Sequence, residues 1–204
     1  MNKSNKSGIV IFGGTFDPAH LSHRQMAEEI SKCDFAEKII ILPAKIPPHK
    51  NRKVTSENHR LNMCRLNFEG IDKVFISDFE MNLTGKNYTV NTLKELQKWG
   101  VVNPFWLIGG DSLVDFEKWY KSEEILKLAK LLVFFRGNIN KDECKNKAEK
   151  LRKKGGNIEF LQFEPANISS TDIREKLLNG EDVSHLLLPS VEEYIRINKL
   201  YKGD

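Results

Sequence analysis

The chain has 204 residues, of which 40% are hydrophobic and 29% are charged, and its formal net charge is +4. These proportions are ordinary for a globular protein and exclude a disordered or collagen-like chain. The longest apolar run, residues 131–135, is much too short to span a membrane, and residues 1–8 lack the apolar segment of a secretory signal. A chain of this length forms one sizeable core, so we expect a single domain over residues 1–204.

The three cysteines, Cys33, Cys64 and Cys144, are isolated from one another along the sequence. An odd number without paired spacing indicates neither a disulfide framework nor a structural zinc site. We therefore expect a protein of the reducing cytoplasm.

The positive charge is concentrated in residues 141–154, which contain seven basic and three acidic side chains. Within this segment Cys144, Ala148 and Leu151 recur at helical spacing, which predicts the buried stripe of an otherwise solvated helix. A nucleic-acid site would use similar basic residues, but this segment has no interleaved aromatic side chains. We therefore expect neither a nucleic-acid partner nor a membrane partner.

Short apolar, β-branched runs alternate along the chain with longer amphipathic stretches. The predicted strands are, in chain order, Gly8–Phe12, Lys38–Leu42, Val74–Ser77, Pro104–Ile108, Leu131–Phe135 and Ile158–Phe163. The predicted helices between them are His20–Lys32, Ser56–Glu69, Thr89–Trp99, Ser122–Ala129 and Lys141–Lys154. A glycine follows three of these helices, as is common at a helix C-terminus: Gly70, Gly100 and Gly155.

Two further helices are expected after the last strand. One spans Asp172–Asn179, and another starts after Pro189-Ser190, where Ser190 and Glu193 have the spacing of a capping box. Strands whose apolar residues point to both faces, and which alternate with helices, form parallel sheets that are covered on both faces. The predicted fold class is therefore α/β, with a doubly wound, mostly parallel, Rossmann-like sheet and a helical C-terminal tail. In such sheets ligands bind at the carboxyl ends of the strands, where the strand order reverses.

The first predicted strand runs directly into the segment GGTFDPAHLSH, residues 13–23. Gly13 and Gly14 would let backbone N–H groups approach a phosphate closely. His20 and His23 share one face of the first turn of the next helix, where the helix dipole favours an anion. The segment therefore predicts a polyanion site. The alternatives are a tight β–α turn with two surface histidines, or a zinc pair that lacks a third ligand at a matching spacing.

Three other segments have chemistry that the residues alone leave open. The loop Pro47–Lys50 is stiffened by two prolines and suits a phosphate monoester, but it could equally be an ordinary connection. The pair Trp119-Tyr120 is either part of a core or a stacking platform for a ring. The segment Ser169–Arg174 is either an ordinary helix N-terminus or a second anion site.

Residues 13–23 resemble the G-[TS]-F-D-P-x-H-x-G-H signature of the nucleotidyltransferase superfamily. Further blocks, in the same order along the chain, narrow the similarity to bacterial-type nicotinate-nucleotide adenylyltransferases. Ser22 stands where the family usually has glycine, a departure that we do not expect to abolish activity. The further blocks are Ile46–Lys50, Tyr88-Thr89 with Thr92-Leu93, Ile108–Ser112, Lys118–Tyr120 and Ile168–Arg174.

This resemblance implies an enzyme that transfers AMP from ATP to nicotinate mononucleotide, giving deamido-NAD and pyrophosphate. His20 and His23 would be the catalytic residues, stabilising the phosphates in the transition state. Mg²⁺ would arrive bound to the nucleotide rather than in a metal site of the protein. The implied ATP site comprises Gly13, Gly14, Thr15, Phe16, Asp111, Ser170, Thr171 and Arg174. The implied mononucleotide site comprises His49, Lys50, Tyr88, Thr89, Trp119 and Tyr120.

Two alternatives stay open. The same scaffold could adenylylate nicotinamide mononucleotide or phosphopantetheine, although Pro47–Lys50 and Trp119-Tyr120 argue against phosphopantetheine. The chain could instead be a non-catalytic nucleotide-binding sensor, although it has both histidines. The sequence leaves open whether the protein forms a homo-oligomer.

Overall fold

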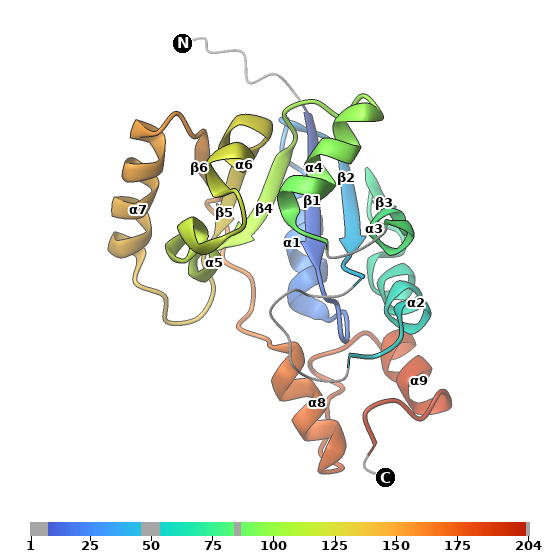
Figure 1. The fold of residues 1–204 in the computed structure, drawn as a ribbon. Coiled ribbons are helices and arrows are strands. Elements are labelled where there is room, and N and C mark those ends of the chain that lie inside the picture. The colour runs from blue at the N-terminus through green and yellow to red at the C-terminus, as the bar shows by residue number, and fades with distance from the viewer. Residues whose placement is uncertain (1–7, 46–53, 84–86, 203–204) are drawn as a thin grey trace.

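The computed structural model describes residues 8–45, 54–83 and 87–202, and its centre is a six-stranded parallel sheet (Figure 1). The strand order is β3-β2-β1-β4-β5-β6. Successive strands are added on one side of β1 up to β3 and then on its other side from β4, so the strand order reverses between β1 and β4 while all strands stay parallel. Each predicted strand is confirmed, and the ends differ from prediction by a few residues. The strands are β1 (Gly8–Gly14), β2 (Ala36–Pro43), β3 (Val74–Ile76), β4 (Phe105–Gly109), β5 (Lys130–Phe134) and β6 (Ile158–Phe160).

The helices connect the strands and then extend beyond the last one. All seven predicted helices are present, together with short elements that periodicity does not reveal. The predicted helices are observed as α1 (Leu21–Ser31), α2 (Glu57–Phe68), α4 (Thr89–Lys98), α6 (Ser122–Leu128), α7 (Lys141–Lys153), α8 (Ser170–Leu178) and α9 (Pro189–Ile197). The short elements are α3 (Phe79–Asn82), α5 (Gly110–Val114) and a 3₁₀ turn, Phe116–Lys118.

One predicted helix start is wrong. α9 begins at Pro189, with Leu188 as its N-cap, so Ser190 lies inside the first turn and does not cap the helix with Glu193. The proline has the fixed φ that the first helical position needs and lacks the N–H that would have no partner there. Proline at this position therefore overrides the capping-box spacing.

The sheet is covered on both faces because alternate side chains of its buried strands point in opposite directions. Val10 and Phe12 of β1 belong to an apolar cluster with residues of α1, α2, α8 and α9. Ile11, between them, belongs to a second cluster with residues of α4, α5, α6 and α7. Cys144 and Leu151 of α7 are among its buried residues, which confirms the stripe predicted for the basic segment.

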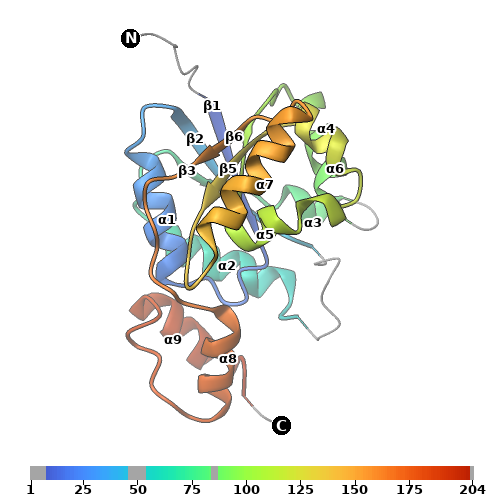
Figure 2. The same cartoon turned by 90° about the vertical axis from the view of Figure 1, so that its left-hand side faces the viewer.

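The two C-terminal helices lie beyond the carboxyl ends of the strands, as both views show (Figure 1, Figure 2). α9 packs against α2, and the start of α8 meets the loop that follows β1. The point at which the strand order reverses is therefore bounded by the β1 and β4 loops and by α8. Among the residues that the structure describes, no helix is both long and apolar enough to cross a membrane.

Candidate active site

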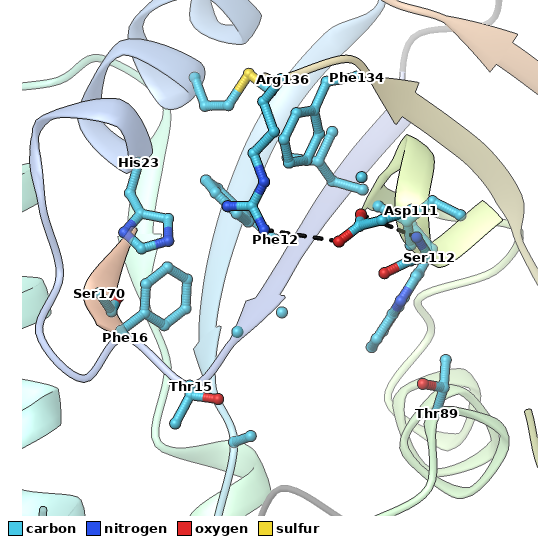
Figure 3. A pocket seen from close by; sticks show the side chains of 18 of the residues that line it. Phe12, Thr15, Phe16, His23, Thr89, Asp111, Ser112, Phe134, Arg136 and Ser170 are labelled. Atoms are coloured by element: carbon cyan, nitrogen blue, oxygen red, sulfur yellow. Dashed lines mark hydrogen bonds and ion pairs between the residues drawn. The ribbon is translucent and has the colours of Figure 1, made fainter. Parts of the chain in front are cut away.

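A cavity of about 520 Å³ opens at the carboxyl ends of β1 and β4, where doubly wound sheets bind their ligands. Its walls come from the loop after β1, the start of α1, the loops after β4 and β5, and the starts of α4 and α8. Figure 3 shows side chains from these separate elements pointing into the same space. The volume is in the usual range for a site that binds a small organic molecule.

The loop after β1 forms the floor of this cavity. Its glycines leave room that a side chain would fill. Gly13 and Gly14 end β1, opposite Leu42 and Pro43 of β2. A Cβ atom on Gly14 would lie 3.0 Å from the ring of Phe16, which folds back over it. Phe16 has a left-handed backbone (φ 49°), and its ring is 2% exposed. The predicted phosphate loop, including Thr15, therefore lies in the cavity with its backbone close to the open space.

The two histidines stand together at the start of α1. His20 is the N-cap residue and is 1% exposed, and its ring stacks on that of His23 with centroids 3.6 Å apart. The backbone N–H of His20 donates to Nδ1 of His23 at 3.3 Å. The ring of Phe16 packs edge-on against His23, with centroids 4.9 Å apart. The imidazoles are therefore held in one orientation on the wall of the cavity.

Both imidazoles are neutral in the ligand-free protein at neutral pH. Burial, together with the nearby Arg136, lowers the pKa of His20 to about 3. Burial, His20 and Arg136 lower the pKa of His23 well below its usual value. A neutral imidazole offers one N–H donor and one acceptor nitrogen. The pair can therefore donate hydrogen bonds to phosphate oxygens, and a bound polyanion would favour the protonated forms.

Arg136 is a site residue that the sequence analysis missed. It lines the cavity just beyond β5, and its Nη2 lies 3.8 Å from Oδ2 of Asp111. Figure 3 shows its guanidinium between His23 and Asp111. Its position after a strand of the parallel sheet was the available signal, because the carboxyl ends of neighbouring strands face the same site. The cavity therefore has a fixed positive charge beside the neutral histidines.

The predicted ring-binding residues gather on the opposite side of the cavity. Trp119 packs on Phe116 with centroids 5.3 Å apart, and the rings of Tyr88 and Tyr120 lie 4.6 Å apart. All three predicted aromatic side chains line the cavity, together with Thr89 at the start of α4. Tyr88 is the N-cap of α4 but makes no side-chain cap hydrogen bond. This wall therefore offers aromatic surface next to a helix N-terminus, an arrangement suited to an aromatic acid.

A buried carboxyl group in this wall was also missed. Glu80 of α3 is 6% exposed and lines the cavity; its Oε1 accepts from Thr92 Oγ1 at 2.7 Å. Its carbonyl accepts from Asn87 Nδ2 at 2.7 Å, so α3 is tied to the start of α4. Burial raises the pKa of Glu80 to about 7, although the Thr92 hydrogen bond opposes the shift. A four-residue helix has no periodicity that could have identified this position.

The start of α8 is a capped helix N-terminus that also forms part of the cavity wall. Ser169 is the N-cap and accepts from the N–H of Thr171 at 3.1 Å, while Ser170 and Thr171 line the cavity. Arg174 stands behind this wall: its Nη1 donates to the carbonyl of Asp17 at 2.7 Å, and its Nη2 donates to Thr171 Oγ1 at 3.1 Å. The structure therefore places the two hydroxyl residues in the cavity and uses Arg174 to join α8 to the β1 loop.

Two predicted residues, His49 and Lys50, lie outside the described part of the chain. Ser22, which replaces the glycine of the signature, is 4% exposed in the first turn of α1 and also lines the cavity. Within residues 8–45, 54–83 and 87–202, no group of three or more His, Cys, Asp or Glu side chains could hold a metal ion.

The fold is that of a nucleotidyltransferase, and the family model for cytidylyltransferase-like proteins matches residues 11–176. A solved structure of Plasmodium falciparum nicotinic acid mononucleotide adenylyltransferase, complexed with NaAD, superposes with a TM-score of 0.77. At 22% identity, with 96% of this chain and 97% of that chain covered, the likeness concerns the fold.

Closer relatives in sequence are bacterial. A protein of Clostridium botulinum (strain Alaska E43) is 38% identical over 95% of this chain and 98% of its own length. A protein of Fusobacterium nucleatum is 39% identical over 92% of this chain and 96% of its own length. Both are named probable nicotinate-nucleotide adenylyltransferases. The chain therefore belongs to the nicotinate-nucleotide adenylyltransferase family, within the cytidylyltransferase-like proteins.

Proposed function

We propose that the protein transfers the adenylyl group of ATP to nicotinate mononucleotide, giving deamido-NAD and pyrophosphate. The observation that carries this proposal is the composition of one cavity. A histidine pair and the start of α8 stand where phosphates would bind, and aromatic side chains stand beside an open helix N-terminus. The family of the chain supports the same assignment.

The chemistry needs little from the protein beyond position and charge. An oxygen of the mononucleotide phosphate attacks the α-phosphorus of ATP, and the bond from that phosphorus to the bridging oxygen of pyrophosphate breaks. The attacking oxygen is already ionised at neutral pH, so the reaction needs no strong general base. Catalysis then consists of in-line positioning and stabilisation of charge on the phosphates. No covalent enzyme intermediate is required.

We assign His20 and His23 to the phosphates at which the reaction occurs. Their stacked rings are fixed by the α1 start and by Phe16, so their N–H groups need little reorganisation. Arg136 adds positive charge on the same wall, and its partner Asp111 is placed to accept hydrogen bonds from ribose hydroxyls. These groups act in a partly dehydrated cavity, where hydrogen bonds to developing charge are strong.

We assign the start of α8 to the β- and γ-phosphates. Ser170 and Thr171 line the cavity at this helix N-terminus, which favours an anion. Thr171 would donate its hydroxyl hydrogen to a phosphate, while the Ser170 hydroxyl donates to the Pro18 carbonyl. ATP brings a divalent cation, which we propose is Mg²⁺ held by phosphate oxygens and water because the described residues lack a protein cage for it. When bound, the ion neutralises phosphate charge. The leaving pyrophosphate is thus stabilised from the α8 side.

We assign the pyridine ring to the wall formed by Trp119, Tyr88 and Tyr120. Trp119 would stack on the ring, and backbone N–H groups near Thr89 and Tyr120 would donate to its carboxylate. Tyr88 and Tyr120 form the edge of this subsite. His49 and Lys50, beyond the described residues, would hold the phosphate of the mononucleotide.

The cysteines of the chain are all free, and we place the enzyme in the cytoplasm.

A pyrophosphate-release assay with ATP and nicotinate mononucleotide tests this function. We expect pyrophosphate to form only when both substrates are present, together with an equal amount of deamido-NAD. Calorimetric titration with ATP, run in parallel, distinguishes a sensor from an enzyme. ATP binding without any turnover would contradict the proposal and favour a nucleotide sensor. Turnover with phosphopantetheine in place of the mononucleotide would contradict the substrate assignment.

A further inference from the structure

Backbone carbonyl groups of the phosphate loop after β1 accept hydrogen bonds from side chains of other elements. Thr15 accepts from Arg60 Nη1 at 2.9 Å, and Pro18 accepts from Ser170 Oγ at 2.9 Å. Asp17, between them, accepts from Arg174 Nη1 at 2.7 Å. The donors come from α2 and α8, which are remote from the loop in sequence. With these carbonyls bound on one side, the loop presents its other face to the cavity.

The carboxylate of Asp17 has a partner from the far end of the chain. Asp17 is fully buried, and its Oδ1 accepts from the hydroxyl of Tyr201 at 2.7 Å. Tyr201 follows α9, and its ring packs on the apolar cluster that includes Met63 of α2. The same hydroxyl lies 3.9 Å from Met63 Sδ. The C-terminal segment therefore reaches the phosphate loop through the hydroxyl group of Tyr201.

The Tyr201 hydroxyl is a permanent donor to this carboxylate. Burial and the adjacent Asp17 raise the pKa of Tyr201 far above neutral, so the phenol keeps its proton at any pH in which the protein works. A hydrogen bond in a buried environment is stronger than the same bond in water. Asp17 precedes the N-cap His20 by three residues. Asp17 therefore belongs to the loop segment that leads directly into the first histidine.

We propose that Tyr201 is a positioning residue for adenylyl transfer: through its hydrogen bond to Asp17 it holds the phosphate loop and the adjoining histidine pair in register with ATP. This inference rests on the proposed function. Tyr201 is not among the residues that line the cavity, so its effect passes through the loop. Catalytic groups displaced by a fraction of an ångström lose much of their effect, since about 1 Å can cost roughly 10²-fold.

The rival explanation is that Tyr201 only fastens the C-terminal segment to the rest of the fold. Tyr194 of α9 offers a matched control for that role. Its hydroxyl accepts from Asn62 Nδ2 at 3.0 Å and lies 2.9 Å from His59 Nδ1, so it fastens α9 to α2. Both partners of Tyr194 belong to α2 and are absent from the cavity lining. Tyr194→Phe and Tyr201→Phe each remove one hydroxyl from this end of the molecule.

The experiment compares these two variants with wild type in the full-length protein. It measures the thermal midpoint, kcat and KM for each substrate, and the Kd for α,β-methylene-ATP, an analogue that cannot react. For Tyr201→Phe we expect kcat/KM for ATP to fall about tenfold and the analogue to bind more weakly, with the mononucleotide KM within about twofold of wild type. For Tyr194→Phe we expect both kinetic constants within about twofold, whatever its loss of thermal stability.

The proposal is overturned if Tyr201→Phe keeps wild-type kcat/KM and analogue affinity while its thermal midpoint falls as in Tyr194→Phe. It is also overturned if the two variants lose the same activity. The analogue needs no turnover, so it tests Tyr201 even if the wild-type enzyme makes no product from nicotinate mononucleotide. Absence of product from nicotinate mononucleotide would contradict the proposed function. Unchanged analogue binding in Tyr201→Phe would contradict the role of Tyr201.

A second variant tests the route through the carboxylate. Asp17→Ala removes the oxygen that accepts from the Tyr201 hydroxyl. If Tyr201 acts through Asp17, the double variant Asp17→Ala/Tyr201→Phe should have a smaller kcat/KM loss than the product of the two single losses. Independent, multiplying losses would contradict this route. If Tyr201→Phe folds poorly, Asp17→Ala alone removes the same hydrogen bond and should lower kcat/KM for ATP, and wild-type kcat/KM in that variant would contradict the route.

Discussion

His20 and His23 are the residues that we assign to the reacting phosphates. Their rings stack at the start of α1, and burial keeps both neutral in the free protein. A neutral pair suits a site that must first admit a polyanion and then hydrogen-bond to it. Arg136 lines the same cavity and brings positive charge before the substrate arrives.

Replacing either histidine should therefore slow the reaction without unfolding the protein. We expect His20→Ala and His23→Ala each to lower kcat about 10²- to 10³-fold, the usual effect of losing one preorganised donor. Steady-state kinetics with circular dichroism as a check of folding measure this. His185→Ala serves as the control, because the His185 side chain is 62% exposed and bonded only locally, to Asp182. Near-wild-type kcat in both site variants would refute the assignment.

Glu80 gives the folded protein a specific dependence on pH. Its pKa is about 7 in the fold and about 4.5 when exposed, so the folded state holds this proton more tightly. Stability therefore falls as pH rises from about 4.5 to about 7 and stays lowered above that, a loss of about 3 kcal/mol. Glu80→Gln keeps the acceptor for Thr92 and removes the ionisation.

We expect the stability of Glu80→Gln relative to wild type to increase with pH across this window. Denaturant unfolding of both proteins between pH 4 and pH 8 measures the difference. The difference between the two curves cancels the titration of every group they share. Parallel curves would show that Glu80 ionises freely in the folded protein.

At the scale of elements, α8 links the two sides of the phosphate site. Ser170 and Thr171 face the cavity, while Arg174, one turn later, donates to the β1 loop. The sequence indicated a helix start with two hydroxyls and an arginine, and the structure confirms Ser169 as the cap. Sequence could not show that the arginine would lie behind the wall, because Asp17 is 157 residues away.

We expect Arg174→Ala to weaken ATP more than nicotinate mononucleotide. The variant removes a charge near the triphosphate and releases the carbonyl of Asp17, and charge-assisted hydrogen bonds contribute about 1.5–3 kcal/mol each. Calorimetric titration with each ligand separately measures this. Arg196→Ala is the control, since that arginine pairs with Glu193 on the surface of α9. An equal loss for both ligands would contradict the assignment to ATP.

The predictability of the helices followed their length. Strands such as β5 and helices such as α7 carry enough periodic residues to be found from sequence, whereas the four residues of α3 do not. The start of α9 was misplaced because Pro189 determined it, not Ser190. The helix C-termini at Gly70 and Gly100 were predicted well because both glycines adopt positive φ.

At the scale of the whole molecule, the site depends on residues brought together from both ends of the chain. The β1 loop was recognisable from its own sequence, but its supports Arg60 and Tyr201 were not, since nothing local indicates a partner so distant. We infer that the chain folds as one unit, because a single sheet separates both apolar clusters. The start of α8 then forms one side of the site, and α9 packs against α2.

We expect the choice between the acid and the amide of the pyridine ring to depend on the donors of the proposed ring-binding wall. Backbone N–H groups near Thr89 and Tyr120 can donate but cannot accept, so they match a carboxylate. A carboxamide placed there would point its NH₂ group at another donor, and both would lose their hydrogen bonds in a partly dehydrated pocket. Trp119 would stack on either ring and so should not affect the preference.

Steady-state kinetics with ATP and each mononucleotide in turn measure whether the enzyme uses nicotinate mononucleotide in preference to its amide. Deamido-NAD or NAD is measured as the product, and kcat/KM is compared between the acid and the amide. We expect the acid to be preferred by about 10²-fold or more, as in sites whose polar groups reject a mismatched partner. Trp119→Ala should weaken both substrates and keep the preference. Equal kcat/KM for the two mononucleotides, or a preference for the amide, would contradict the account.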